Sequence, residues 1–538
     1  MSIMDEKAPK QSGGAGSQAI AEAVHTEGRP HGTAATFAQN SIMNLGRLFV
    51  TAAIAIVLPG YLTRRLSVTT YSAWVLILQL GAYVSYLDFG IQSGIAKFVA
   101  EYEAKKDTDG ASLRASVGLA LMLIASTVGL ALTLALAWQV PQLFHDMPAA
   151  LYRDARLSIL FVGVSLSFGL LCSIFPSIFF GLQRYAVPTV ILLTNRLLYA
   201  AVLVAAVARQ QSLAVMGALV AIVNIVTGLL HFEAWRRWAC TIRLRLHGLD
   251  GSVVRKMLGY CSSLAIWTVG MLCVSGLDVI IVGRYDFRQT AFYSVAALPT
   301  GFVTSIVGAA LAPLMPSMSA LSVLRSPGEL GVLLARATRY TSVILLLSGL
   351  PLLVAGYWIL RVWVGPIYAS HAISYLRILV LANILRCTCL PYANMLVATN
   401  SQRIAVAGVI AEAITNVGCS IYLAGRIGAI GVAYGTLVGA FVSVGAHFII
   451  NMRYTMAKFT ISRMRLFLTG LVRPATIAVP SLLLITFWWS SAAPAFNQQI
   501  WLGWGLGTLI LAWLVGLKAM ERDALVGFVG RWVRPRTY

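Results

Sequence analysis

The stretch from residue 115 to residue 138 reads ASVGLALMLIASTVGLALTLALAW and carries no charged side chain. About 20 consecutive apolar residues are enough to cross the hydrocarbon of a bilayer as an α-helix. The apolar residues here are continuous and do not alternate with polar ones, as they would in a strand of a transmembrane barrel. A helix also satisfies its own backbone hydrogen bonds, which hydrocarbon requires. The stretch therefore predicts a transmembrane helix.

Similar stretches recur from about residue 40 to residue 520, and together they decide the fold class. Apolar residues make up 58% of the 538 residues and charged ones 11%, whereas a soluble domain carries about 25% charged residues. We predict an all-α polytopic membrane protein with about fourteen transmembrane helices. The predicted spans are 39–59, 71–98, 115–138, 157–180, 187–208, 213–234, 258–282, 292–320, 339–362, 373–397, 404–424, 429–451, 475–491 and 500–518.

The basic residues indicate the orientation of these spans. The net charge is +22, but lysine and arginine lie in short loops between spans and do not form one continuous face, so we predict no nucleic-acid partner. Loops on the side of the N terminus hold about three times as many lysines and arginines as the opposite loops. The positive-inside rule then places both termini in the cytoplasm, in a multi-pass protein of the bacterial inner membrane.

The chain also contains an internal repetition. QRYAV at 183–187 opens the fifth span and QRIAV at 402–406 opens the eleventh, and Thr-Asn follows at 194–195 and at 415–416. Six spans per copy is an even number, so the two copies would be parallel repeats. We predict six parts: a cytoplasmic tail at 1–38, a six-helix bundle at 39–234, a basic linker at 235–257, a second six-helix bundle at 258–452, two extra helices at 453–520, and an amphipathic cytoplasmic tail at 521–538.

Motifs for covalent chemistry are missing from the sequence. The chain has no phosphate-binding Gly-rich loop, no Gly-x-Ser-x-Gly and no His-Glu-x-x-His. None of its seven cysteines belongs to a Cys-x-x-Cys pair, and a structural role as small buried side chains fits them better than metal binding. We therefore expect no catalytic residue, no metal site, no cofactor and no enzymatic activity.

Four segments, in order along the chain, resemble the polysaccharide-exporter branch of the multidrug/oligosaccharidyl-lipid/polysaccharide exporter superfamily, the Wzx-type O-antigen and exopolysaccharide flippases. They are LDFGIQSGIAKFVAEY at 87–102, GLDVIIVG at 276–283 with AFYSVA at 291–296, ILRVWVGP at 359–366, and GRIGAIGVA at 425–433. Each segment alone is weakly specific, and the resemblance covers about residues 38–455. It implies two six-helix bundles around a central cavity, followed by two trailing helices.

The resemblance also implies a function. The substrate would be an oligosaccharide repeat unit on an undecaprenyl-pyrophosphate carrier, flipped from the cytoplasmic to the periplasmic leaflet for exopolysaccharide, capsule or O-antigen export. Coupling to a proton or a sodium gradient stays open. The implied partners are the lipid-linked glycan, membrane lipids, and a polymerase and chain-length regulator of the same pathway.

Charged side chains inside predicted spans are the candidates for the mechanism, because an ionised group at mid-bilayer costs about 2.5–3.5 kcal/mol on insertion scales. Guanidinium groups hold phosphate oxygens in a bidentate manner and stay charged in a low dielectric. We expect Arg47, Arg196 and Arg386 to contribute to a cationic cavity for the pyrophosphate, and Arg377 to lie near the outer end of its span. The alternative is structural pairing with an acidic residue or snorkelling to an interface.

The acidic and amide candidates have two interpretations each. Asp278 and Glu412 are candidates for coupling or gating because a buried carboxylate exchanges protons readily, or else they are structural partners. Asp88 belongs to the same set, although an anchoring role in a helix turn is the favoured interpretation. Three asparagines, Asn44, Asn195 and Asn416, bind either sugar hydroxyls or neighbouring helices, and interhelical hydrogen bonding is the more common use.

Three other functions compete with the flippase of a lipid-linked oligosaccharide. An ion-coupled multidrug-type exporter would favour an acidic cavity, and the intramembrane arginines slightly outnumber the carboxylates. A lipid II flippase for peptidoglycan precursor shares the cationic cavity. A membrane polysaccharide polymerase or ligase would use a large external loop, whereas the external loops predicted here are short.

Overall fold

The computed structural model describes residues 50–516, apart from 249, 325–326, 400, 402 and 490–497, together with Arg522. Every regular element in this part of the chain is a helix, which confirms the predicted all-α class. Twelve of these helices, counting segments joined across short breaks, are long and apolar enough to cross a membrane. Residues 50–65 are helical where the first span is predicted, and Leu502–Gly516 is a shorter apolar helix where the last is predicted.

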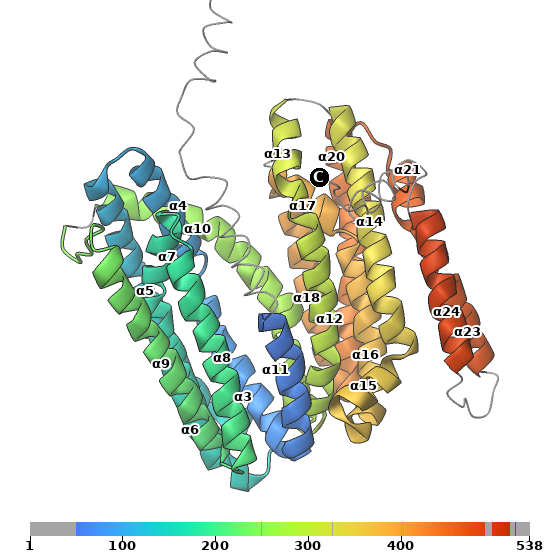
Figure 1. The fold of residues 1–538 in the computed structure, drawn as a ribbon, viewed down its shortest axis with the longest axis horizontal. Helices are drawn as coiled ribbons and strands as arrows, with labels where there is room; N and C mark the ends of the chain where they lie inside the picture. The colour runs from blue at the N-terminus through green and yellow to red at the C-terminus, as the bar shows by residue number, and fades with distance from the viewer. Residues whose placement is uncertain are drawn as a thin grey trace, which may run out of the picture. The chain divides into compact units, whose positions relative to one another are not determined.

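The first half of the chain forms long helices joined by short turns. After the helix at 50–65 they are α3 (Val68–Tyr86), α4 (Ile91–Ala104), α5 (Thr108–Leu143), α6 (Ala149–Cys172), α7 (Ile174–Gly181), α8 (Ala186–Ala208) and α9 (Leu213–Trp238). Polar side chains begin several of them: Ser67 accepts the backbone N–H of Thr70, and Asp107 accepts that of Gly110. The helix α6 packs along both α5 and α9 (Figure 1).

The second half begins after an irregular segment at 239–248. Its helices are α10 (Gly251–Met271), α11 (Asp278–Tyr285), α12 (Gln289–Leu311), α13 (Leu314–Val323), α14 (Pro327–Val354), α15 (Gly356–Val364), α16 (Pro366–Cys387), α17 (Leu390–Ala398), α18 (Arg403–Ile427) and α19 (Ile430–Gly445). The remaining helices are α20 (Met452–Phe459), α21 (Arg463–Phe467), α22 (Arg473–Ala475), α23 (Val479–Trp489) and α24 (Gln498–Leu511). The helices α12 and α16 lie side by side (Figure 1).

Some of the helices are longer than the predicted spans. The helix α5, for example, covers 36 residues against the 24 apolar ones at 115–138. The apolar pattern marks only the part that hydrocarbon requires, while the helix continues into the polar boundary, where caps end it. The same effect explains the thirteenth span, which is predicted to begin at 475 but belongs to a helical segment that begins at Arg463.

Several predicted spans contain breaks that the apolar pattern does not reveal, among them the breaks between α3 and α4 and between α10 and α11. Between α3 and α4 the backbone at Phe89 and Gly90 has positive φ, 44° and 80°, a conformation that glycine adopts without strain. A side chain at Gly90 would also collide with Leu264 of α10, whose Cδ1 lies 2.6 Å from the position of a Cβ. Between α10 and α11 the chain forms a π-helix at Leu272–Gly276, a feature common next to functional sites.

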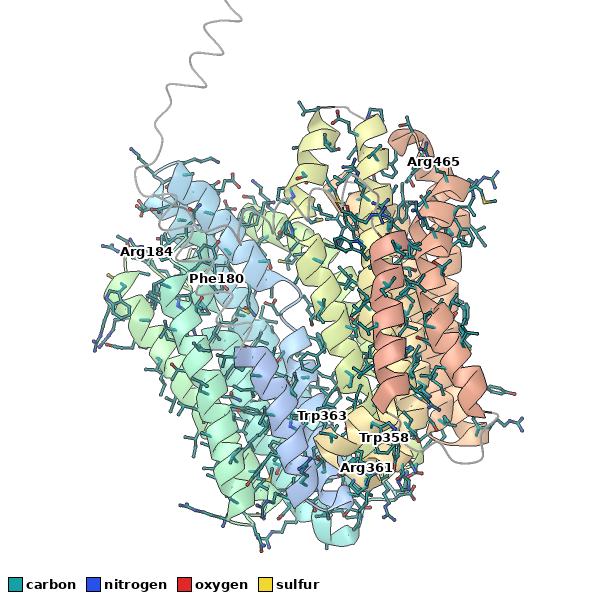
Figure 2. The ribbon with its side chains drawn as sticks, turned by 45° about the vertical axis from the view of Figure 1, so that its right-hand side comes forward. Phe180, Arg184, Trp358, Arg361, Trp363 and Arg465 are labelled. Carbon is teal, nitrogen blue, oxygen red and sulfur yellow. The ribbon has the colours of Figure 1, made fainter. Side chains whose placement is uncertain are left out.

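The two ends of the helices carry different side chains. Phe180, Arg184 and Arg465 lie toward one end, which we call the linker end because residues 239–248 belong to it, and Trp358, Arg361 and Trp363 lie toward the other (Figure 2). This alternation follows the sides assigned to Arg184, Arg361 and Arg465 by the predicted span order.

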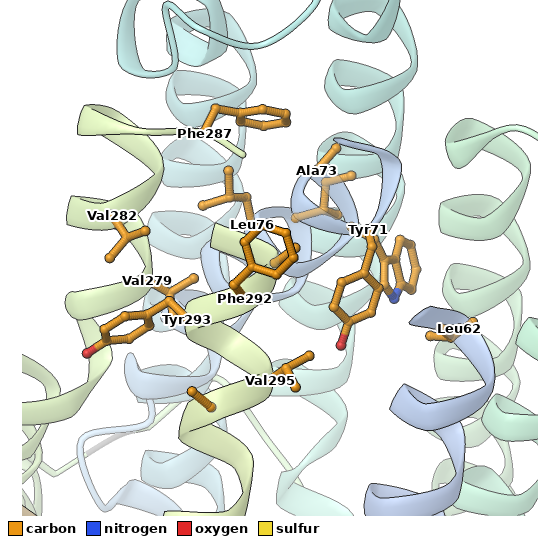
Figure 3. Close-up of a cluster of buried hydrophobic side chains, with 14 of the residues drawn as sticks. Leu62, Tyr71, Ala73, Leu76, Val279, Val282, Phe287, Phe292, Tyr293 and Val295 are labelled. Carbon is orange, nitrogen blue, oxygen red and sulfur yellow. The ribbon is translucent and has the colours of Figure 1, made fainter. Parts of the chain in front are cut away.

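One buried cluster joins the two halves of the chain at the end of the helices where Trp363 lies. We call this end of the helices the closed end. The cluster contains Leu62, Tyr71 and Leu76 of the first half together with Val279 and Phe292 of the second (Figure 3). Hydrogen bonds accompany it: the Ser72 hydroxyl donates to the carbonyl of Arg288 (3.3 Å) and accepts the N–H of Ala291 (3.2 Å). The closed end is therefore a packed contact between the halves.

At the linker end the buried side chains form separate clusters. One contains α4, α5 and α7 with the first turns of α10, through Val253, Met257 and Cys261. Another contains α12–α14, α17 and α20, and it includes no residue of the first half. The helix α10 therefore begins packed on the first half and leads, through the π-helix, to α11 at the closed end.

Candidate functional site

Asp278 lies at the start of α11, directly after the π-helix, and it is almost fully buried. Its Oδ2 accepts hydrogen bonds from the Tyr293 hydroxyl (3.0 Å) and the Thr436 hydroxyl (3.0 Å). Its other oxygen, Oδ1, is buried and makes no hydrogen bond within the described part of the chain. A buried polar atom without a partner is costly, so this oxygen is available for a proton or a cation.

Polar atoms of α18 and α19 continue from Asp278 toward the π-helix. The Asn416 amide donates to the carbonyl oxygen of Val274 (2.7 Å), within the π-helix, and its own Oδ1 accepts from Ser420 (3.2 Å). The Val432 carbonyl lies within reach of the hydroxyls of Ser420 (3.3 Å) and Thr436 (3.1 Å). We call Asp278, Asn416, Ser420 and Thr436 the C-half polar cluster. Of the two interpretations of Asn416, its geometry fits interhelical hydrogen bonding.

Arg386 and Glu412 face each other across α16 and α18. Arg386 Nε lies 2.6 Å from Glu412 Oε1, with 20% of the arginine side chain and 6% of the glutamate side chain exposed. Arg386 Nη2 is buried and makes no hydrogen bond within the described residues. The pair corresponds to the structural interpretation of these residues, yet the guanidinium retains a donor that Glu412 does not use.

Arg196 and Arg377 are both exposed, on α8 and α16. Arg196 forms no salt bridge with any described carboxylate. Arg377 donates from Nε to the carbonyl oxygen of Leu353 on α14 (3.3 Å). Neither joins the C-half polar cluster. The fourth arginine, Arg47, lies outside the described residues, as does Asn44.

Asp88 and Asn195 have local partners. Asp88 Oδ1 accepts the backbone N–H of Gln92 (3.0 Å) in the break between α3 and α4, as the favoured interpretation of a helix-turn anchor requires. The break lies inside the candidate span Val68–Ala104. Asn195 donates to the Thr227 hydroxyl on α9 (2.8 Å).

Sequence reasoning missed the residues that position Asp278. Tyr293 and Thr436 are separated from it by 15 and 158 residues, and neither is charged, so no pattern distinguishes them from other tyrosines and threonines in spans. Two residues of α3 were missed as well: Gln79 Nε2 and the Tyr83 hydroxyl both donate to the carbonyl oxygen of Gly276, at 2.7 and 2.8 Å. These bonds connect the first half to the last residue of the π-helix, two positions before Asp278.

The described residues contain no group of three or more His, Cys, Asp or Glu side chains that could hold a metal ion. The oxygens of the C-half polar cluster are the hard ligands that small cations and protons prefer. Chemically, the arrangement suits reversible binding of a cation or a proton, while the arginines suit binding of an anion.

The fold of the chain is that of transporters of the MOP superfamily. A multidrug resistance MATE family transporter of that superfamily, solved in an inward-facing conformation, aligns with a TM-score of 0.63 at 15% identity, covering 77% of this chain and 99% of that one. The lipid II flippase MurJ, in an inward closed conformation, aligns with a TM-score of 0.62 at 14% identity, covering 90% and 99%. An outward-facing MATE transporter gives 0.56 at 15% identity, covering 79% and 96%. No protein-family model and no curated protein sequence matches the chain.

These likenesses agree with the superfamily fold that the four segments predicted. The assignment to Wzx-type flippases in particular stays a prediction.

Proposed function

We propose that the protein is a flippase that moves an undecaprenyl-pyrophosphate-linked oligosaccharide from the cytoplasmic to the periplasmic leaflet by alternating access. The proposal rests on the hydrogen-bond donors that two arginines keep without an acidic partner. Arg196 is exposed without a described salt bridge, and Arg386 keeps a buried Nη2 donor after pairing with Glu412. Inside a membrane such donors need an anion, and a diphosphate supplies oxygens with the geometry that guanidinium groups bind.

The packing of the two halves supports alternating access. The halves share one core at the closed end, whereas at the linker end only the first turns of α10 pack on the first half and α12–α14, α17 and α20 belong to a cluster of the second half alone. By the positive-inside rule, the excess of lysine and arginine on the linker side favours a cytoplasmic position of that end. The substrate headgroup would then enter from the cytoplasm and leave when the closed end opens.

The C-half polar cluster is the proposed coupling site. A proton or a sodium ion bound at Asp278 Oδ1 would neutralise a buried carboxylate that sits two residues after Gly276. The carbonyl oxygen of Gly276 accepts hydrogen bonds from Gln79 and Tyr83 of the first half. A change in the charge of Asp278 would therefore occur next to a contact between the halves. Glu412, held by Arg386, would stabilise the same half during the cycle.

The experiment follows the lipid carrier. In the producing cell the gene is deleted, and lipid-linked oligosaccharides are extracted after each leaflet has been probed with a membrane-impermeant glycosidase or lectin. Accumulation of undecaprenyl-pyrophosphate-linked repeat units on the cytoplasmic side supports the proposal. Unpolymerised repeat units on the periplasmic side would overturn it and indicate a polymerase or ligase.

An ion-coupled multidrug-type exporter is the second candidate, since a MATE transporter has as high a TM-score as MurJ. Transport assays in vesicles containing the purified protein distinguish the candidate functions. Efflux of a cationic dye that depends on Asp278 would favour the exporter. Translocation of lipid II without translocation of the oligosaccharide carrier would favour a peptidoglycan-precursor flippase.

A further inference from the structure

A cavity of about 260 Å³ with a mixed polar and apolar lining lies inside the first half of the chain, and no proposal above uses it. We call it the N-half cavity. Its lining comes from α3, α4, α6, α7, α8 and α9, and its polar side chains include Ser85, Gln92, Asn195, Asn224, Thr227 and His231. It lies on other helices than Asp278 and Arg386, which belong to α11 and α16.

His231 shows what the cavity would bind. The side chain is 4% exposed, and its Nδ1 lies 2.9 Å from the backbone carbonyl oxygen of Thr227. Since a carbonyl oxygen only accepts, Nδ1 carries the hydrogen, and Nε2 of the neutral ring is then an acceptor. Nε2 is buried and makes no hydrogen bond within the described residues. An O–H or N–H donor from a ligand would satisfy it.

The amides add further hydrogen-bonding groups with a fixed direction. Asn195 donates to Thr227 (2.8 Å) and Asn224 donates to Ser165 (3.2 Å). Each amide uses one N–H in this way and keeps its second N–H and its carbonyl oxygen for a ligand. The two amides and His231 therefore present acceptors from α8 and α9, a set that suits a ligand with several hydroxyl groups.

The charge and shape of the lining narrow the ligand class further. The lining contains no Asp, Glu, Lys or Arg, so it offers no partner to an ionised ligand, which would be costly to bury there. Apolar side chains, among them Leu166, Leu170 and Phe180, complete the wall. A pyranose ring combines apolar C–H faces with equatorial hydroxyls and fits such a mixed lining. The volume lies just below the range of about 300–1,000 Å³ of sites for drug-sized ligands, so one ring is the expected size.

We propose that the N-half cavity is a binding site for a single neutral sugar ring of the transported glycan, an inference that rests on the proposed function as a glycan-lipid flippase. His231 Nε2 and the carbonyl oxygens of Asn195 and Asn224 accept hydrogen bonds from the hydroxyls of the ring. Phe180 lies toward the linker end of the helices (Figure 2). The sugar would therefore be bound on the cytoplasmic side, on other helices than Arg386 and close in sequence to Arg196, which follows Asn195 on α8.

Saturation-transfer NMR on the purified full-length protein tests this site. The protein is kept in an amine-oxide detergent, because a maltoside or glucoside detergent would itself present sugar rings. The probes are glucose, galactose, mannose, rhamnose and N-acetylglucosamine, with glucuronate as a charged probe. We expect at least one neutral sugar to bind and glucuronate to bind more weakly.

Variants locate the binding. His231→Phe removes the acceptor, and Asn195→Leu removes a second one, and each should weaken binding about tenfold or more, as expected for the loss of one buried hydrogen bond. His231→Gln, which can supply an amide oxygen, should retain part of the binding. The matched control is His371→Phe, since His371 is exposed and lies outside the cavity lining. Size-exclusion profiles confirm folding of each variant.

The proposal is overturned if no neutral sugar binds, or if sugar binds equally well to the wild type and to every cavity variant. The cavity would then hold only ordered water. The result is separable from the proposed function. Loss of sugar binding with normal translocation of the glycan carrier overturns only the sugar site. Sugar binding without accumulation of carrier-linked glycan in the deletion strain contradicts the flippase and leaves the N-half cavity as a sugar site of another transporter.

Discussion

Arg386 on α16 and Glu412 on α18 form a salt bridge, with Nε of the arginine 2.6 Å from Oε1 of the glutamate, in the second half of the chain. Removing one partner leaves the other charge buried and unpaired, which costs about 3–5 kcal/mol. We expect Arg386→Ala and Glu412→Ala each to lower the melting temperature of the purified protein. The double variant Arg386→Met with Glu412→Met should regain most of the stability, because apolar replacements of buried pairs are often neutral.

The double variant separates the two roles of Arg386. If the guanidinium binds the diphosphate, a stable double variant still fails to complement the deletion strain. Normal glycan export by that variant would make the pair purely structural and would remove Arg386 from the substrate site.

Arg196 gives a cleaner test, because it is exposed and forms no salt bridge with a described residue. Surface substitutions usually change stability by less than about 0.5 kcal/mol, so Arg196→Ala should leave protein levels normal. We expect it to abolish export of the glycan, measured by complementation of the deletion strain. The control is Arg209→Ala at the exposed end of the same helix. Full complementation by Arg196→Ala would exclude the residue from the site.

Asp278 should make the protein sensitive to the coupling ion. A ligand that binds only the folded state stabilises it by about 2.7 kcal/mol at a hundred times its dissociation constant. We therefore expect the melting temperature of the wild type to rise when sodium chloride replaces choline chloride, or when the pH is lowered if protons are the coupling ion. Asp278→Asn should lose that rise, because the amide cannot carry the charge that binds the ion.

The control for this measurement is Asp146→Asn, which changes an exposed carboxylate in the turn before α6. An Asp278→Asn protein that keeps the full response to both sodium and pH would assign the coupling to another group.

The proposed alternating-access cycle requires the closed end to open, so a covalent link across it should stop the cycle. Ser72 on α3 and Ala291 on α12 are joined by a hydrogen bond from the Ala291 N–H to the Ser72 hydroxyl (3.2 Å). In a background with the seven native cysteines replaced, Ser72→Cys with Ala291→Cys should be cross-linked by a short thiol reagent. We expect carrier translocation in vesicles to fall to the background level and to return after reduction.

A second cysteine pair controls for the chemistry itself. Ser126 and Ser167 lie on α5 and α6 of the same half, connected by a hydrogen bond of 2.7 Å from the Ser126 hydroxyl to the Ser167 carbonyl. Cross-linking them should leave translocation unchanged. Full activity with the Ser72–Ala291 link in place would show that the closed end does not need to open there.

The contact between α18 and α19 depends on glycine. A Cβ at Gly435 would lie 2.2 Å from the Ser420 hydroxyl oxygen and 2.5 Å from the Ser420 backbone nitrogen, and small residues permit such close helix packing in membranes. Overpacking costs about 1–3 kcal/mol, so Gly435→Ala should lower the melting temperature. Gly418→Ala is the matched control, with nothing within 4 Å of its Cβ position. There, alanine should raise stability by about 0.5–1 kcal/mol. Equal behaviour of the two variants would contradict the close packing.

Sequence alone determined the all-helical class, the order of the spans and which charged residues lie within them. Burial of apolar segments in hydrocarbon is a local property, because each segment such as 115–138 must satisfy its own backbone whatever its neighbours are. The deeper acids were also found from the sequence, since a charge inside an apolar stretch is visible without knowing its partners. The four family-like segments indicated the superfamily fold in the same way.

Tertiary structure decided which groups meet. Whether Arg386 finds Glu412 depends on the register of α16 against α18, and whether Asp278 finds Thr436 depends on helices 158 residues apart. The π-helix before Asp278, the break at Gly90 and the orphaned nitrogen of His231 also leave no trace in an apolar pattern. These features arise from packing between helices, where a rotation of one residue, about 100° around the axis, turns a side chain from a partner to the lipid.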